Sequence, residues 1–216
     1  RDKNLYHSSC KIRRASSASL TQSLQTRRLK ALKMDLISWT LGAIRGAEFE
    51  GIIMNWLEEQ RVAWASLLSS KLGYFLDGAS IVLVCDDEYS WFEEYFIKNI
   101  NTPSKTRPLI PVVPLRSLYP RIDTSVLDES EMALLDDMLN ISFGNNFVYF
   151  YIGKGSSKLS LIAKSHQNSY MWLFGEQAQN AFCLEKNDPL LDIKILALFR
   201  LFDMSLSEVI LGKITL

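Results

Sequence analysis

Apolar residues recur every three or four positions from Met34 to the middle seventies, which is the period of an amphipathic helix. The first stretch of this pattern includes Ile44 and is interrupted near Gly46, so we expect a short helix there. A longer helical pattern runs from Phe49 and closes at Gly78. Stripes of this kind are more often core or helix-helix contacts than cofactor sites. The sequence therefore predicts that helices come first in the domain.

After residue 79 the pattern changes to short, β-rich apolar runs that alternate with helical segments. The predicted strands are 80–84, 109–113, 147–152, 170–174 and 181–184. The predicted helices are 90–100, 128–139, 156–163 and 190–211. Continuously apolar strands separated by helices indicate a parallel sheet that is covered on both faces. The fold class is therefore predicted to be α/β, with a doubly wound parallel sheet preceded by helices.

The second predicted strand lies between Pro111 and Pro114. Proline has no backbone N–H to donate to a sheet, so it is confined to edge strands, strand ends and bulges. We therefore expect this strand at an edge of the sheet.

Three successive carboxylates, Asp86, Asp87 and Glu88, follow the first predicted strand. In folds of this kind the same turn usually holds a glycine-rich phosphate loop at the start of a helix. Two interpretations are open: the acids are charges at the N-terminal end of the helix, near a Ser90 cap, or they form an acidic recognition surface. Under either one, their negative charge would repel a phosphate.

A second turn, Gly153-Lys154-Gly155-Ser156-Ser157, ends the third predicted strand and has the composition of a phosphate loop. It lacks the spacing of both GxxxxGK[ST] and GxGxxG, so the match is weak. A turn that ends the strand and a serine that caps the next helix explain these residues without a ligand.

The charges are unevenly distributed, although the whole chain has 24 basic and 24 acidic residues. Residues 1–33 contain nine Lys or Arg and one acid, a net charge of +8, which leaves −8 on the remainder. A basic, Ser-rich segment of this kind is typical of a nucleic-acid arm, a targeting segment or an expression remnant. Because the first methionine is Met34, we interpret residues 1–33 as a leader that is non-native or translated upstream. Residues 34–216 are predicted to be the single folded domain.

The residue inventory offers little for catalysis or metal binding. Cys10, Cys85 and Cys183 are isolated and odd in number, which argues against a disulfide framework and favours a reducing compartment. Neither His7 nor His166 has a partner at metal-ligand spacing, and no Ser-His-Asp arrangement is visible. No apolar run reaches the roughly 18 residues of a membrane span. We expect a soluble, cytoplasmic protein without catalytic residues, metal or cofactor.

The last predicted helix carries more apolar surface than one sheet contact needs, since such a contact uses a stripe only about 100° wide. Its polar positions, Asp192, Arg200, Asp203 and Ser207, line up on one side. We expect a second partner, such as another subunit, to cover the apolar surplus. The candidate partner-binding residues are Phe202, Leu206, Val209 and Ile210 as a buried contact, with Asp86, Asp87 and Glu88 as a polar rim.

Several motifs of this chain are similar to those of one bacterial family. The stretch AFCLEKNDPLLDIKILALFRLFDMSLSEVILGKITL, with SWFEEYFIKNIN, TRPLI, SLYP and MWLF, resembles the HobA family of replication-initiation regulators. The likeness runs in order from about Met34 to Leu216, includes WLEEQR near its start and is most specific in the final third. No residue of 1–33 takes part in it.

The resemblance implies a five-stranded parallel sheet similar to sugar isomerase (SIS) domains and to the functional counterpart DiaA, assembled as a homotetramer. It also implies a non-enzymatic regulator that binds the N-terminal domain of the initiator DnaA and promotes its oligomerisation at the origin. The family has no short contact motif that would transfer partner contacts residue by residue.

Two other functions compete with this one. A phosphosugar-binding or isomerase protein of the SIS class is opposed by the acidic turn at residues 86–88. Direct nucleic-acid binding rests on the basic leader alone, because a domain with net charge −8 repels a phosphate backbone.

Overall fold

The structure, a computed structural model, describes residues 34–123 and 128–216. After a two-residue strand at Met34–Asp35, two helices precede the large sheet. α2 (Leu36–Phe49) begins at Asp35, whose carboxylate accepts a hydrogen bond from the backbone N–H of Ser38 at 3.0 Å. A single 3₁₀ turn, η1 (Asn55–Leu57), precedes α3 (Arg61–Leu76). Residues Asp35–Leu216 form one compact unit, and the interpretation of residues 1–33 as a leader lies outside the described residues.

The predicted boundary between the first two helices is wrong. α2 continues through Gly46 because Ile44 and Ala47 are buried on one face, and a glycine costs an exposed helix only about 1 kcal/mol. The chain leaves the helix at Gly51, where φ is 77°, a conformation that favours glycine. The longer helical pattern predicted from residue 49 is therefore divided, and its helix begins at Arg61.

The sheet has five parallel strands, as predicted. They are β2 (Ser80–Cys85), β3 (Val112–Pro114), β4 (Phe147–Lys154), β5 (Ser169–Phe174) and β6 (Ala181–Leu184). Their spatial order is β3-β2-β4-β5-β6, so β3 is an edge strand, as its prolines predicted. This is the order of a doubly wound sheet, in which the direction of winding reverses between β2 and β4. The predicted fold class is confirmed.

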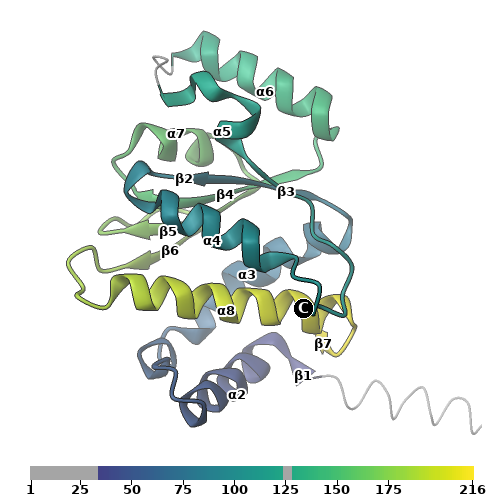
Figure 1. The fold of residues 1–216 in the computed structure, drawn as a ribbon, viewed down its shortest axis with the longest axis vertical. Helices are drawn as coiled ribbons and strands as arrows, with labels where there is room; N and C mark the ends of the chain where they lie inside the picture. The colour runs from purple at the N-terminus through teal and green to yellow at the C-terminus, as the bar shows by residue number, and fades with distance from the viewer. Residues whose placement is uncertain (1–33, 124–127) are drawn as a thin grey trace, which may run out of the picture. The chain divides into compact units, whose positions relative to one another are not determined.

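Helices cover both faces of the sheet (Figure 1). Their bounds are η2 (Asp87–Tyr89), α4 (Ser90–Ile100), α5 (Leu115–Leu118), η3 (Pro120–Asp123), α6 (Glu129–Phe143), α7 (Lys158–Ser165) and α8 (Leu191–Ile210). α3, α4 and α8 pack on one face, and α5, α6 and α7 on the other. A separate two-stranded sheet pairs β1 (Met34–Asp35) with β7 (Ile214–Thr215).

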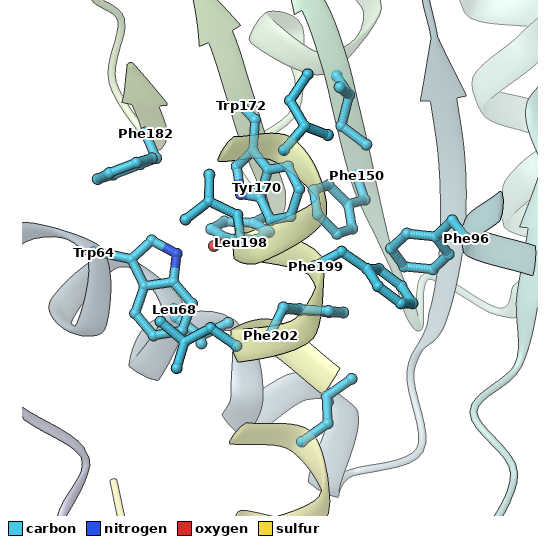
Figure 2. Close-up of a cluster of buried hydrophobic side chains, with 14 of the residues drawn as sticks. Trp64, Leu68, Phe96, Phe150, Tyr170, Trp172, Phe182, Leu198, Phe199 and Phe202 are labelled. Carbon is cyan, nitrogen blue, oxygen red and sulfur yellow. The ribbon is translucent and has the colours of Figure 1, made fainter. Parts of the chain in front are cut away.

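Successive residues of each strand point to opposite faces, so the two cores differ in composition. On the face of α4 and α8, Phe150 of β4 and Tyr170 and Trp172 of β5 are fully buried together with Phe96 and Phe202 (Figure 2). The opposite core contains Tyr149, Met171 and, from α6, Leu135 and Leu139. The larger core is thus aromatic and is centred under α8.

Candidate functional site

A small mouth opens where β2 and β4 end side by side. Its cavity of about 260 Å³ is lined by the acidic turn after β2 and by the glycine turn after β4. The lining residues are Asp86, Asp87, Glu88, Lys154, Ser157, Lys158 and Leu159. The two turns that the sequence singled out separately are therefore brought together at the carboxyl edge of the sheet.

Asp86 points into the fold and is buried. Its Oδ2 accepts a hydrogen bond from the backbone N–H of Lys154 at 2.8 Å, and its Oδ1 lies 2.9 Å from the hydroxyl of Tyr151, which also lies 2.8 Å from the carbonyl oxygen of Lys154. Burial and then the charge of Asp86 raise the pKa of the Tyr151 phenol above its ordinary value, so the phenol keeps its proton. The carboxylate therefore fastens the end of β2 to the end of β4 through the Lys154 N–H and a neutral phenol that it shares with the Lys154 carbonyl.

Gly153 allows this approach, because a Cβ at that position would clash with Asp86 and would lie 2.6 Å from the Tyr151 hydroxyl. The second glycine of the turn, Gly155, is covered in the same way: a Cβ there would clash with the side chain of Glu176. Lys164 holds Glu176 by an ion pair at 3.0 Å. Side chains of the protein itself thus occupy the space above both glycines.

Asp87 and Glu88 face solvent, and their side chains are 85% and 62% exposed. Asp87 makes an ion pair with Arg116, and Glu88 makes one with Lys154. Pairs with this exposure contribute little to stability because water screens them. These two acids are the part of the turn that a partner can reach.

The structure places Asp87 and Glu88 in the first turn of a helix, whereas an acidic recognition surface stays a prediction. α4 begins at Ser90, but its cap position is Tyr89 and has no side-chain hydrogen bond, so the expected Ser90 cap is wrong. The residues before it, 87–89, form the 3₁₀ turn η2. Asp86 contacts β4 instead of the helix end, a role that the sequence pattern did not reveal.

The apolar surplus of α8 is used inside the protomer. α2 covers the side of α8 that faces away from the sheet, and α3 packs beside α8 (Figure 1). Phe202 is fully buried against Phe150 and Tyr170, with ring centroids 5.2 and 6.0 Å away (Figure 2). The chain's own N-terminal helices therefore cover much of the surplus, and contact of α8 with a second subunit stays a prediction.

The other three residues of the candidate apolar contact differ in how far the protomer buries them. Leu206 is fully buried and Val209 is 5% exposed, so both are core residues of the protomer. Ile210, the last residue of α8, keeps part of its side chain at the surface. Contact of any of these residues with a partner stays a prediction.

Two of the polar residues on α8, Asp203 and Ser207, belong to a buried cluster of ion pairs and hydrogen bonds. Asp203 is buried and makes ion pairs with Lys105 and with Arg107, the latter at 2.8 Å. Arg107, whose side chain is 1% exposed, also donates to Ser207 at 3.2 Å and to the carbonyl of Ile100. The cluster fixes the segment that leads from α4 to β3 onto α8. An acid inside an apolar helix is the sequence signal that could have indicated a buried cation.

A wider groove of about 620 Å³ lies next to this cluster, between α4 and α8. Its walls carry Tyr95 and Ile193, which are 38% and 48% exposed, and Lys105 lies at one end. The groove is open and half apolar, with no arrangement of side chains that suggests catalysis.

The described residues give little support for a metal site, a reactive thiol or a membrane-spanning helix. Within residues 34–123 and 128–216, His, Cys, Asp and Glu nowhere gather in a group of three that would hold a metal ion. Cys85 is buried and Cys183 half-buried, both as free thiols in strands, and burial raises the pKa of each. The helices of this part of the chain are too short or too polar to cross a membrane.

Known proteins similar to this chain point to one family. A family model described as HobA, a DNA replication regulator, matches residues 33–216. The DNA replication regulator protein HobA of Helicobacter pylori is 32% identical over 174 residues, which are 78% of this chain and 91% of that protein. A crystal structure of HobA from the same organism is 28% identical, with a TM-score of 0.66, and covers 85% of this chain and 99% of that one.

A further solved structure is a complex. It is a HobA-DnaA (domain I-II) complex from Helicobacter pylori, whose matching chain is 29% identical, with a TM-score of 0.63. The match covers 85% of this chain and 99% of that chain. The family indicated by the motifs of the sequence is confirmed, and this chain belongs to the HobA family of DNA replication regulators.

Proposed function

We propose that this protein binds the N-terminal domain of a DnaA initiator and holds several initiator molecules together at the chromosomal origin. The observation that carries the proposal is the similarity, over 85% of the chain, to a protein solved in complex with DnaA domains I-II. The fold of this chain, with its five-stranded sheet, matches that protein with a TM-score of 0.63.

The protein acts as an adaptor without catalytic activity, and its cellular site is the cytoplasm, where the chromosome is replicated. Support for the first point comes from the relative's name as a regulator and from the residues in the mouth. An isomerase or phosphosugar protein needs a turn that accepts a phosphate. Here the Asp86 carboxylate stands against Gly153 and takes the N–H of Lys154, so the mouth disfavours that alternative.

Several initiator molecules are held because the protein is a homotetramer, as the family resemblance implies. Each bound initiator then meets its neighbours at a high effective concentration without new contacts between them. The exposed acids Asp87 and Glu88 are the proposed polar rim of the contact, with Ile210 as the accessible member of the apolar set.

Light scattering on the protein with and without the N-terminal domain of its own DnaA tests both parts. The expected masses are those of a tetramer and of a tetramer with several initiator domains bound. A protein that stays monomeric, or whose mass does not change with the initiator domain, contradicts the proposal.

Surface plasmon resonance on Asp87→Ala then examines the rim. Rim charges act mainly on the association rate, so this rate should fall several-fold and lose part of its salt dependence, while the dissociation rate is unchanged. Asp137→Ala is the matched control, because it removes an equal charge from an exposed position on α6. Equal effects of the two variants would point to net charge instead of the mouth.

A further inference from the structure

The mouth between β2 and β4 lies at the place where open α/β sheets bind ligands. The helices that follow these two strands leave on opposite faces of the sheet, so the chain opens a crevice between their carboxyl ends. Asp86 follows the last residue of β2, and Lys154 is the last residue of β4. The position alone makes this turn the first location to examine for a ligand.

The turn after β4 has the local features that bring a backbone close to an anion. Gly153 and Gly155 carry no side chain, and Ser157 caps the helix that follows by accepting a hydrogen bond from the N–H of Leu159 at 3.3 Å. In this chain both glycines face carboxylates of the protein itself, Asp86 and Glu176. The space that the missing glycine side chains leave is therefore already filled by these two carboxylates.

Asp86 makes the contacts that a bound anion would make. One of its oxygens accepts from a backbone N–H of the glycine turn at 2.8 Å, and the other lies 2.9 Å from a phenol whose proton is retained. Both donors are neutral, and the carboxylate is buried. Oriented backbone N–H groups in a turn are a general means of holding anions.

We propose that the turn at Gly153 is an anion-binding turn held closed by Asp86, whose carboxylate is a built-in ligand that keeps phosphate groups out. The protein thus retains the cradle of a phosphate site in a self-occupied form. This role of Asp86 does not depend on initiator binding.

The balance of charge in the mouth agrees with this role. Arg116 pairs with Asp87 and Lys154 pairs with Glu88, while Asp86 and Lys158 add one further acid and one further base to the mouth. Removing the Asp86 carboxylate leaves two acids and two bases in the lining, with Arg116 as a further base beside Asp87. The same change therefore frees the donors and makes the mouth less negative.

The test is a titration of the wild-type protein and of Asp86→Ser with inorganic phosphate at constant ionic strength. Calorimetry measures binding, and the melting temperature is measured at each phosphate concentration. Serine is uncharged and shorter than aspartate, so it leaves room for an anion beside the Lys154 N–H. Phosphate should bind Asp86→Ser at least about tenfold more tightly than wild type and raise its melting temperature. For wild type, neither phosphate nor hexose phosphates should give saturable binding within the concentrations used, so the tenfold difference is a lower bound.

Two further variants make the result specific. Asp86→Asn removes the charge but fills the same space, so it should bind phosphate more weakly than Asp86→Ser does. Asp87→Ala removes an equal charge from the exposed side of the same turn and should behave as wild type. A folded Asp86→Ser that ignores phosphate overturns the proposal, as does an equal gain in Asp87→Ala. If Asp86→Ser unfolds in chloride, rescue by phosphate supports the proposal and lack of rescue counts against it.

Discussion

Two buried carboxylates, Asp86 and Asp203, lie in different parts of the fold and are held by different kinds of partner. Asp86 follows β2 and is bound by a backbone N–H and a phenol, both neutral. Asp203 is bound by the cations Lys105 and Arg107, in the segment that leads into β3. The first arrangement leaves neutral donors behind when it is broken, and the second leaves a buried charge. We therefore expect the two sites to respond differently to the same substitution.

The largest effect is expected at Phe202, which lies next to Asp203 on α8 and sets the scale for packing in that region. Phe202→Ala removes a fully buried ring that meets Phe150 and Tyr170, and should lower the free energy of unfolding by about 4 kcal/mol. Urea unfolding followed by circular dichroism measures this loss. Ile210→Ala is the control on the same helix, because its side chain is partly exposed and should cost far less. Similar losses for the two variants would contradict the core assignment.

The next effect is at the ion pairs. Asp203→Ala leaves the guanidinium of Arg107, 1% exposed, without its carboxylate, and should lower the free energy of unfolding by about 3 kcal/mol. Replacing both partners, as in Asp203→Leu with Arg107→Met, should recover most of this loss, since no charge is then left buried. A double variant no more stable than Asp203→Ala would show that the ion pair is not the source of the effect.

A smaller effect at Asp86 makes the contrast measurable. Asp86→Asn keeps the shape of the side chain and leaves only neutral groups, so the free energy of unfolding should fall by about 1 to 2 kcal/mol. Parallel urea titrations of Asp86→Asn and Asp203→Asn give the comparison directly. Equal losses at the two sites would mean that the charge of the partners does not decide the outcome.

The smallest effect is expected at the exposed neighbour of Asp86. Asp87→Ala breaks an ion pair whose carboxylate is 85% exposed, so the free energy of unfolding should change by less than about 0.5 kcal/mol. The melting temperature in low and high salt checks this, with Glu88→Ala as a second variant of the same kind. A loss as large as that of Asp86→Asn would show that the whole turn, and not Asp86 alone, fastens β2 to β4.

Most of the fold follows from local patterns in the sequence. The five parallel strands are continuously apolar, and the prolines around β3 reveal that it is an edge strand. Both signals are local, so a single sequence carries them. The break predicted at Gly46 failed for a reason that is not local: the burial of Ile44 and Ala47 outweighs the low helix propensity of one glycine.

The candidate site was less predictable, because its roles depend on which segments meet. Asp86, Asp87 and Glu88 are adjacent in sequence, but only Asp86 reaches the backbone of β4, 68 positions away along the chain. Likewise, the apolar surplus of α8 was visible in the sequence, whereas its partners, α2 and α3, become evident only when the chain is folded. Periodicity shows how much surface a helix must bury, but it does not show what covers that surface.

The position of α8, beside α3 on the sheet and beneath α2, also bears on how the protein is made. A ribosome completes α2 and α3 more than a hundred residues before it reaches the end of α8. At about 5 to 20 residues per second, the nascent chain waits on the order of ten seconds for its last helix. During that time the side chains of Trp64 and Leu68 lack their final cover. Chaperones that recognise exposed apolar segments are thus expected to attend the early helices of this protein during translation.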